Sequence, residues 1–334
     1  MVRVEGRDQE AARPWVGLAA NASSGLGAGR RQVERLVAAL TARGFRPRIA
    51  WTLAERSELV EQTRLEPGCR GLVAVGGDGT VADLINERPG VPLAVLPAGT
   101  ENLFARHFHF PRRPEALAEI LRRGRTTLLD LGETGGRRFA LMAGFGFDAD
   151  VVTRHHRWRT GRSGAVRPTH RVAYVGPVVQ ASLAYRFPAV TVRTLDPPGE
   201  TLVGTTAFVF NLPRYALGLP FAPQARGDDG FLDLVVFRDP GPLRALRYLW
   251  LVLRGLHLRQ SGVYHRRVRR IEVEASETVP VQLDGDPAGA VEPGQPWTVT
   301  VEPGAVEVLV PGAKGEAREP GPGPSTRNLV PQDG

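Results

Sequence analysis

The first part of the chain alternates unbroken apolar runs with segments whose apolar residues recur every three or four positions. Val33, Leu36, Val37 and Leu40 follow helical spacing, whereas the run 71–77 is apolar almost throughout and typical of a buried strand. The pattern predicts strands over 15–20, 47–53, 71–77 and 92–100, and helices over 29–43, 54–65, 81–87, 101–108 and 114–123. Strands that alternate with helices favour a parallel sheet with helices on both faces.

The pattern changes after about Thr127, where short β-rich segments dominate. They predict strands over 127–133, 137–145, 189–195, 201–212, 230–237, 269–275, 280–286, 297–303 and 306–310, with helices over 149–157, 171–185 and 242–258. The fold class expected is an α/β N-terminal domain with a parallel sheet, followed by a mostly antiparallel β-sandwich C-terminal domain. We expect a flexible leader over 1–13, the α/β domain over 14–130, the β-rich domain over 131–311 and a disordered Gly/Pro-rich tail over 312–334.

Composition narrows the class of protein. Of the 334 residues, 42% are hydrophobic and 23% are charged, which is typical of a globular chain. The single cysteine, Cys69, excludes an internal disulfide framework and a multi-cysteine metal site. The most apolar stretch, around 243–258, is interrupted by arginines, so no membrane-spanning helix is predicted. Without an apolar leader segment, a cytoplasmic protein is the expectation.

The charged residues restrict the chemistry further. The net charge is +8, and Lys314 is the only lysine, placed in the tail. Mechanisms that need a lysine inside the fold, such as that of a P-loop, are therefore excluded. The basic excess fits phosphorylated ligands, an anionic membrane surface or nucleic acid without choosing among them.

The sharpest local signal is GGDGT, which follows an apolar strand and precedes a short helix. Consecutive glycines let backbone N–H groups turn toward an anion at a helix N-terminus. Asp78 is unusual in a loop that holds phosphate, and it suits a magnesium ligand or a general base. A tight turn with Asp78 as a helix cap is the structural alternative.

Two further loops follow strands of the same predicted sheet. NASSG (21–25) and PAGTEN (97–102) are rich in small and hydroxyl-bearing residues. The carboxyl ends of parallel strands share one edge, where ligands of α/β sheets bind, so the three loops are expected to converge on one crevice. The run GLGAG (25–29) lacks the spacing of a dinucleotide fingerprint.

At these residues the sequence resembles the diacylglycerol kinase catalytic-domain family, which includes bacterial lipid kinases and the sphingosine and ceramide kinases. The resemblance spans roughly residues 15–310 and rests on NASSG, VAVGGDGTVADLINE (73–87), LPAGTENLFAR (96–106), FALMAGFGFDADVV (139–152), DDGFLDLVV (228–236) and VQLDGD (281–286). GGDGT is also shared with NAD kinases. What the resemblance implies is transfer of the γ-phosphate of ATP to a lipid hydroxyl, with diacylglycerol as the leading acceptor.

The resemblance also implies roles for individual residues. Those expected to bind nucleotide are Asn21, Ser23, Ser24, Gly25, Thr52, Gly76, Gly77, Asp78, Gly79, Thr80, Val81, Ala82 and Thr100. Asp229 and the backbone of Phe231 match the family's structural Mg²⁺ ligands, a choice of oxygen donors that suits this ion.

The family's general base lies in an Asp-Gly-Glu motif, which reads Asp284-Gly285-Asp286 in this chain. Asp284 and Asp286 would point to one side of a strand, and Asp286 takes the position of the base. Asp78 is the alternative base. A plain turn is the non-catalytic interpretation of the motif.

Other functions are compatible with the sequence. A sphingoid or ceramide-type lipid kinase, an NAD kinase and a catalytically weak nucleotide- or lipid-binding module are the alternatives, in that order. The segment 151–195 has no acidic residue and carries Trp158 among several arginines, so it is the expected membrane-facing surface of a transiently membrane-associated protein. A solvated basic loop is the alternative there. No nucleic-acid partner is expected, and a homodimer is left open.

Overall fold

The computed structural model describes residues 13–20, 28–160, 176, 180–181 and 184–312. Its first part contains four parallel strands in the order β2-β1-β3-β4. Their bounds are β1 (Trp15–Ala20), β2 (Arg46–Ala50), β3 (Cys69–Gly76) and β4 (Leu93–Pro97). The side chains of β1 and β4 are buried throughout, as expected for strands covered on both faces.

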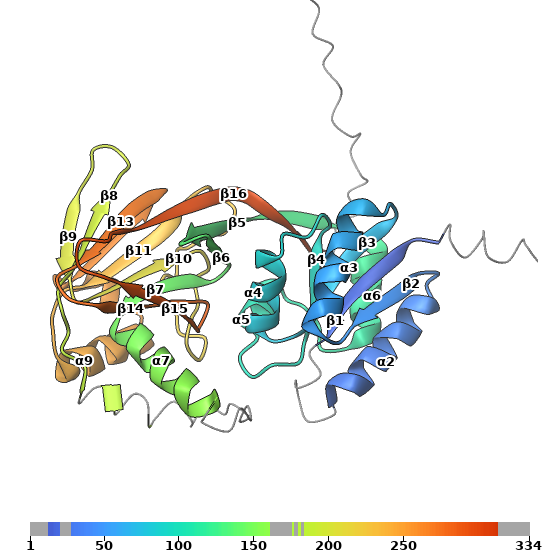
Figure 1. Cartoon of the computed structure of the whole chain (residues 1–334), viewed down its shortest axis with the longest axis horizontal. Helices are drawn as coiled ribbons and strands as arrows, with labels where there is room; N and C mark the ends of the chain where they lie inside the picture. The colour runs from blue at the N-terminus through green and yellow to red at the C-terminus, as the bar shows by residue number, and fades with distance from the viewer. Residues whose placement is uncertain (1–12, 21–27, 161–175, 177–179, 182–183, 313–334) are drawn as a thin grey trace, which may run out of the picture.

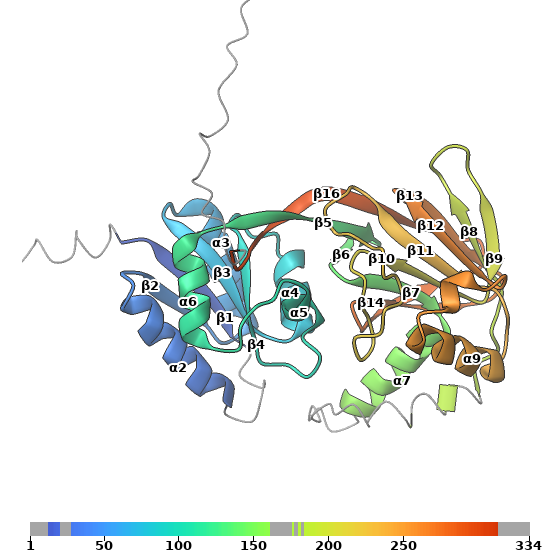
Figure 2. The same ribbon diagram turned by 180° about the vertical axis from the view of Figure 1, so that it is seen from behind.

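Helices cover both faces of this sheet. α2 (Ala28–Thr41) and α6 (Pro114–Arg123) pack together on one face, and α3 (Leu53–Leu65) lies on the other (Figures 1 and 2). The shorter helices α4 (Asp78–Asn86) and α5 (Leu103–His107) begin shortly after β3 and β4 end. The predicted parallel α/β arrangement is confirmed.

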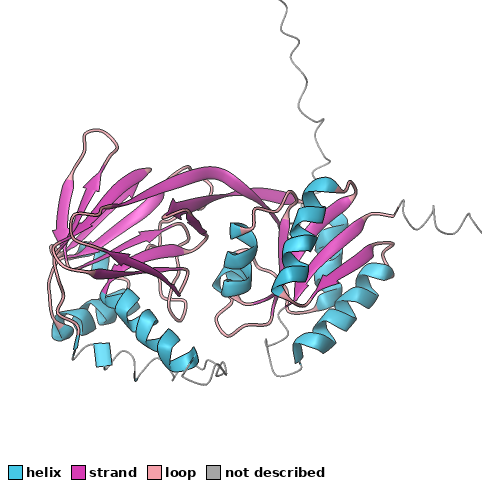
Figure 3. Ribbon diagram, viewed as in Figure 1, coloured by secondary structure: helices cyan, strands magenta, loops and turns pink. Residues whose placement is uncertain are grey.

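The second part is built from two antiparallel sheets, so the predicted β-sandwich is also confirmed (Figure 3). A six-stranded sheet has the order β12-β11-β10-β7-β14-β15. The other sheet joins β16, β13, β8 and β9, with β5 and β6 attached to β16. The bounds are β5 (Thr126–Thr134), β6 (Arg137–Phe139), β7 (Met142–Gly146), β8 (Val190–Thr194), β9 (Thr201–Gly204), β10 (Thr206–Phe210), β11 (Leu232–Phe237), β12 (Val263–Val268), β13 (Arg270–Ala275), β14 (Val279–Leu283), β15 (Asp286–Val291) and β16 (Trp297–Leu309).

The described residues of this part also form two longer helices and one short 3₁₀ turn. α7 (Phe147–Thr160) follows β7, and α9 (Pro242–Leu253) and η2 (His257–Arg259) connect β11 to β12. The expected helix over 242–258 therefore ends at Leu253, and the expected strand over 137–145 is two strands. Most of the expected helix over 171–185 lies outside the described residues.

Two long strands join the two parts. β5 and β16 pair antiparallel over most of their length, from Thr134 opposite Val299 to Thr126 opposite Leu309. The beginning of β16 also pairs with β13, and its end pairs with β4 at Leu93. Position 130, the predicted domain limit, falls inside β5, so the chain passes between the two parts along a continuous ribbon (Figure 1).

Candidate active site

The carboxyl ends of the parallel strands bring the predicted phosphate loops to one edge of the sheet. Gly76 is opposite Pro97 in the register of β3 and β4, so the loops that follow them start side by side. β1 ends at the same edge, but Asn21, Ser23, Ser24 and Gly25 lie outside the described residues. The convergence of 76–80 and 97–102 is therefore found as predicted.

Glycine lets these two loops touch. A Cβ atom on Gly99 would lie 2.6 Å from the Cα of Gly77, far inside contact distance. Asn102 fixes the second loop, because its Oδ1 accepts the Gly99 N–H at 2.9 Å and its Nδ2 donates to the Gly99 carbonyl at 2.6 Å. The side chain of Asn102 is buried, and the sequence placed this residue in the PAGTEN loop without giving it a role of its own.

Asp78 ties the first loop to the helix after the second. Its two oxygens accept the N–H groups of Leu103 at 3.0 Å and Phe104 at 2.9 Å, at the start of α5. Burial raises the pKa of Asp78, while these two amides act against the rise. Asp78 is thus a cap, as one interpretation held, but of α5 rather than of the helix that it begins.

The other residues predicted to bind nucleotide differ in their exposure. Thr80 is buried against Gly76, and Val81 lies in the hydrophobic core. Ala82 lines a cleft, and Thr100 is exposed in the second loop. Thr52 lies at the carboxyl edge as the N-cap of α3, where its Oγ1 accepts the Glu55 N–H at 3.2 Å.

The Asp284-Gly285-Asp286 motif forms a hairpin turn instead of a straight strand. Asp284 and Gly285 have φ angles of 51° and 90°, and Leu283 pairs with Asp286 across the turn. Positive φ at both central residues is typical of the tightest hairpins, for which Asp-Gly is a preferred sequence. The expectation that Asp284 and Asp286 point to one side of a strand is therefore wrong.

Asp284 faces the connection between β6 and β7. Its carboxylate accepts the N–H groups of Ala140, Leu141 and Met142 at 2.8 to 2.9 Å. Burial raises its pKa to about 6 against the effect of these amides, and the nearby charge of Asp78 adds to the rise. Asp284 thus holds the hairpin in place.

Asp286 lies across from the GGDGT loop. A Cβ atom on Gly79 would be 3.8 Å from Asp286 Oδ2, so this carboxylate borders the start of α4. Burial raises the pKa of Asp286, and Asp83 acts in the same direction, whereas Arg159, His156 and Arg137 oppose it. Asp78 and Asp284 commit their carboxylates to backbone amides, whereas the carboxylate of Asp286 faces the cleft, and this suits Asp286 to accept a proton.

A cleft of about 290 Å³ lies between the two parts of the molecule beside Asp286. Residues from α3 and α4 form one wall, and β6 and the β14–β15 hairpin form the other. The lining residues are Arg56, Ala82, Asp83, Asn86, Glu87, Arg137, Arg138, Leu283, Asp284 and Asp286. The cleft thus combines three arginines with four carboxylates, and Arg56 is already paired with two of them, those of Asp83 and Glu87.

Asn86 fastens the two walls of this cleft. Its Nδ2 donates to the Arg138 carbonyl at 2.9 Å and its Oδ1 accepts the Arg138 N–H at 2.9 Å. A third hydrogen bond, to the Ala82 carbonyl, keeps the side chain aligned along α4. Sequence reasoning did not predict this contact, because no local pattern shows that α4 will meet β6.

Gln282 and Asp148, which the sequence analysis did not single out, form a second polar group under the hairpin. The buried Gln282 donates from Nε2 to Asp148 Oδ2 at 2.9 Å, and its Oε1 accepts the Gly285 N–H at 2.8 Å. Burial raises the pKa of Asp148 to about 6, against hydrogen bonds from Gln282 and Tyr215. The position of Asp148 inside the FALMAGFGFDADVV motif was the available signal.

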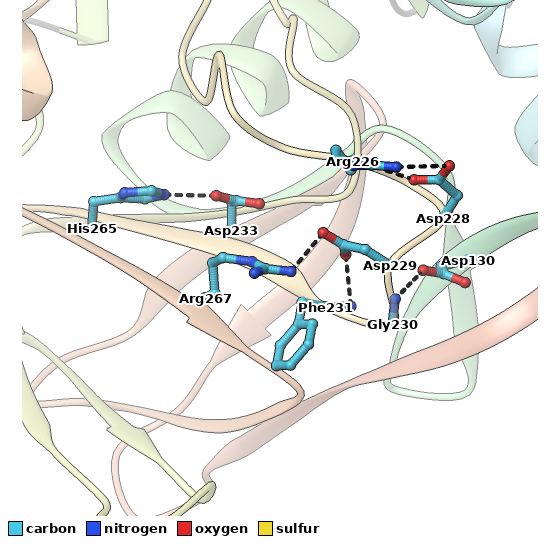
Figure 4. A network of polar contacts seen from close by, with 9 residues as sticks. All are labelled: Asp130, Arg226, Asp228, Asp229, Gly230, Phe231, Asp233, His265 and Arg267. Carbon is cyan, nitrogen blue, oxygen red and sulfur yellow. Dashed lines mark hydrogen bonds and ion pairs between the residues drawn. The ribbon is translucent and has the colours of Figure 1, made fainter.

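The predicted magnesium ligands, Asp229 and Phe231, lie just before β11 (Figure 4). Asp229 Oδ1 accepts the Phe231 N–H at 3.1 Å, and its Oδ2 pairs with the Arg267 guanidinium at 2.6 Å. The guanidinium carbon of Arg267 also lies 4.4 Å from the centre of the Phe231 ring. Beside them, Asp130 accepts the Gly230 N–H at 2.7 Å.

These contacts do not fit a magnesium ion at Asp229. Each carboxylate oxygen of Asp229 already accepts a hydrogen bond from an N–H group, and Arg267 supplies positive charge where a divalent ion would. No group of three His, Cys, Asp or Glu side chains suited to a metal ion occurs within the described residues. The assignment of Asp229 and Phe231 to magnesium stays a prediction from the resemblance, and no chemical step is derived through it.

Both parts of the chain match known protein families. The model of the diacylglycerol kinase catalytic domain matches residues 16–134, and that of the YegS C-terminal NAD kinase beta sandwich-like domain matches 142–310. A Pseudomonas aeruginosa protein named "Probable lipid kinase YegS-like" is 32% identical over 303 residues, covering 89% of this chain and 95% of that protein. A Mycobacterium tuberculosis diacylglycerol kinase is 30% identical over 253 residues, covering 73% and 78% of the two chains.

A solved structure supports the fold alone. The crystal structure of a diacylglycerol kinase from Bacillus anthracis has a TM-score of 0.63 at 16% identity, covering 90% of this chain and 97% of that one. Both parts of the chain and their order are therefore accounted for by known relatives. The chain belongs to the diacylglycerol kinase family of lipid kinases, with a YegS-type C-terminal domain.

Proposed function

We propose that this protein transfers the γ-phosphate of ATP to the hydroxyl group of diacylglycerol, forming phosphatidic acid. The observation that carries the proposal is the position of Asp286, whose carboxylate borders Gly79 of the phosphate loop from the opposite wall of the cleft. Phosphate and acceptor hydroxyl would then meet between the two parts of the chain. Relatives named as a probable lipid kinase and as a diacylglycerol kinase support a lipid acceptor.

The loop 76–80 would bind the phosphates mainly through its backbone. Its glycines and the N-terminus of α4 favour an anion, and the family's use of ATP makes the phosphates the natural ligand. Arg137 lines the cleft and adds positive charge, whereas the guanidinium of Arg138 is paired with Glu302 at 2.5 Å. The only lysine of the chain lies outside the described residues. Magnesium bound to the ATP phosphates would neutralise further charge.

Asp286 would act as the general base. The lipid oxygen forms a bond to the γ-phosphorus as the bond from that phosphorus to the bridging oxygen of ADP breaks. The hydroxyl proton passes to the Asp286 carboxylate and then to solvent. A carboxylate whose pKa is raised by burial holds a proton better than an ordinary aspartate, which favours this step.

Asp78 would be a positioning residue. Both of its oxygens accept amide protons of α5, so its carboxylate holds the two phosphate loops together. This arrangement favours Asp286 over Asp78 as the base.

The acceptor is tested with the purified full chain and labelled ATP and magnesium. Diacylglycerol, sphingosine and ceramide are offered separately in mixed micelles, and NAD is offered in plain buffer. Label in phosphatidic acid, and much less in the other products, is the expected result. Preferential labelling of a sphingoid product would change the acceptor, and labelling of NAD alone would overturn the proposal. ATP binding without transfer to any acceptor would instead indicate a binding module.

A further inference from the structure

Helix α9 carries an apolar face that the protein leaves in solvent. Its exposed apolar side chains recur at intervals of three or four residues, so they form one stripe along the helix. The exposed fraction ranges from 39% at Leu249 to 80% at Leu243. The stripe consists of Leu243, Leu246, Leu249, Trp250 and Leu253. Single exposed leucines are common on protein surfaces, but five large apolar residues on one helix indicate a binding surface.

The opposite face of α9 is fixed to the fold. Tyr248, Leu251 and Val252 are buried, and the Tyr248 ring lies 4.8 Å from that of Phe237 in β11. The Tyr248 hydroxyl donates to Asp239 at 2.7 Å. The exposed stripe is therefore presented by a firmly packed helix.

The surroundings of the stripe are basic. No Asp or Glu occurs between Asp239 and Glu272. Four of the eight arginines in that segment, Arg244, Arg247, Arg254 and Arg259, lie in or just after α9, whereas the other four belong to β12, β13 and the turn between them. Arg244 and Arg247 are exposed on α9, and Arg254 is exposed at its C-terminal cap, where its guanidinium lies 5.5 Å from the centre of the Trp250 ring. Leucine and tryptophan on one side of a helix, with arginines beside them, are typical of helices that lie in the headgroup region of an anionic membrane.

The position of α9 agrees with this partner. Figures 1 and 2 both draw α9 and α7 at the same lower edge of the C-terminal part, away from the tip formed by β8 and β9. Trp158, near the end of α7, is 43% exposed. Among the described residues, no helix is long and apolar enough to span a membrane.

We propose that α9 is the surface by which this protein docks on an anionic lipid bilayer. Leu243, Leu246 and Trp250 enter the apolar boundary, while the arginines of α9 contact lipid phosphates. The inference names a surface outside the segment 151–195 expected from the sequence. Its purpose, the collection of a lipid acceptor, rests on the proposed function, but the binding itself does not.

The test measures sedimentation of the full chain with vesicles of phosphatidylcholine alone and of phosphatidylcholine mixed with phosphatidylglycerol. We expect binding to the mixed vesicles, and a loss of about tenfold or more in the variant Leu246→Glu/Trp250→Glu. Leu243→Glu is a second, single-site variant that disturbs the fold least. Leu65→Glu, at an exposed position on α3, is the matched control and should bind like wild type.

Arginine variants separate charge from apolar insertion. Arg244→Gln/Arg247→Gln should weaken binding to the mixed vesicles by about fivefold for each charge removed, and should reduce the salt dependence. Unchanged binding of both α9 variants, Leu246→Glu/Trp250→Glu and Leu243→Glu, each with a wild-type circular dichroism spectrum, would overturn the inference. A wild-type dimer that binds no vesicles and becomes monomeric in Leu246→Glu/Trp250→Glu would also overturn it, since α9 would then bind a second copy.

A kinase assay keeps the two proposals apart. With a short-chain diacylglycerol dispersed as monomers, the α9 variants should phosphorylate the acceptor at the wild-type rate. Vesicle binding that depends on α9 in a protein without lipid kinase activity would uphold this inference while the proposed function fails. Wild-type phosphorylation together with vesicle binding that is insensitive to α9 would do the reverse.

Discussion

At the scale of single residues, three aspartates near one loop have different environments. The carboxylate of Asp78 accepts hydrogen bonds from two backbone amides, and that of Asp284 accepts three. Asp286 instead lies in the cleft among charged side chains of α4, β6 and α7. The sequence shows the same residue type three times, and only the hydrogen bonds separate the structural aspartates from the candidate base.

The raised pKa of Asp286 predicts a pH dependence of kcat/KM. A general base works when deprotonated, so kcat/KM should rise with pH through the pKa of Asp286 and then level off. Because burial raises that pKa, the rise should lie above about pH 4, where an ordinary aspartate titrates. Asp83→Asn removes a charge that raises this pKa, so the rise should move to lower pH by less than about one unit. A rise that moves upward in Asp83→Asn would contradict this account.

Because Arg267 pairs with Asp229, we predict that the fold needs no metal ion at Asp229. Thermal unfolding of the wild type should be the same with magnesium and with a chelator. Arg267→Gln should lose about 1 kcal/mol, since an exposed ion pair and a cation–π contact are lost. Asp229 is then freed, so added magnesium should restore part of the loss.

Arg266→Gln is the matched control, because Arg266 forms a similar exposed ion pair with Glu200 at 2.6 Å. Magnesium should not stabilise this variant. A wild type that melts at a lower temperature in the chelator would show that a divalent ion, and not Arg267, neutralises Asp229.

At the scale of elements, the close approach of the two loops is the feature most sensitive to substitution. Gly99→Ala would place a Cβ atom 2.6 Å from the Gly77 Cα, so one loop must move. We expect a loss of about 1–3 kcal/mol in the free energy of unfolding and a higher KM for ATP. Urea denaturation measures the first and steady-state kinetics the second.

Gly79→Ala is the control for stability. Its added Cβ would meet no atom nearer than Asp286 Oδ2 at 3.8 Å, an ordinary contact. The free energy of unfolding of this variant should match that of wild type. Equal stability of Gly99→Ala and Gly79→Ala would show that the loops are not packed as described.

Elements with a clear pattern were predictable, and those defined by long-range pairing were not. The α/β units and the loops after β3 and β4 followed from apolar runs and glycines. β15 was missed because Asp286–Val291 contains proline and glycine and few residues that favour strands. The Asp284–Gly285 turn had a usable signal, since Asp-Gly between apolar segments is typical of a hairpin. The helix α9 was expected from the sequence. Which of its faces is exposed was not, because that depends on which face packs against β11.

At the scale of the whole molecule, the cleft depends on how the two parts are held together. The β5–β16 ribbon joins them on one side, and Asn86 joins α4 to the Arg138 backbone beside the cleft. The family resemblance made both parts predictable. This contact was not, because it depends on side-chain geometry between segments 52 residues apart.

The Asn86 contact predicts a variant that damages catalysis more than folding. Asn86→Ala removes both hydrogen bonds to Arg138 and lets Asp286 shift relative to the phosphate loop. We expect kcat to fall by about tenfold or more, because small displacements at a reacting centre are costly. The free energy of unfolding should fall by about 1–3 kcal/mol. Gln62→Ala, on the surface of α3, should leave kcat unchanged, and an equal kcat for Asn86→Ala would refute the role of this contact.

The central claim is that Asp286 accepts the proton during phosphoryl transfer across the cleft. The most direct test is single-turnover transfer of labelled phosphate from ATP to diacylglycerol by wild type, Asp286→Asn, Asp78→Asn and the surface control Glu34→Gln. We predict that Asp286→Asn binds ATP like wild type but transfers phosphate about 10²- to 10⁴-fold more slowly, while Glu34→Gln is unaffected. Transfer at the wild-type rate by Asp286→Asn, with transfer abolished in a folded Asp78→Asn protein, would contradict the account.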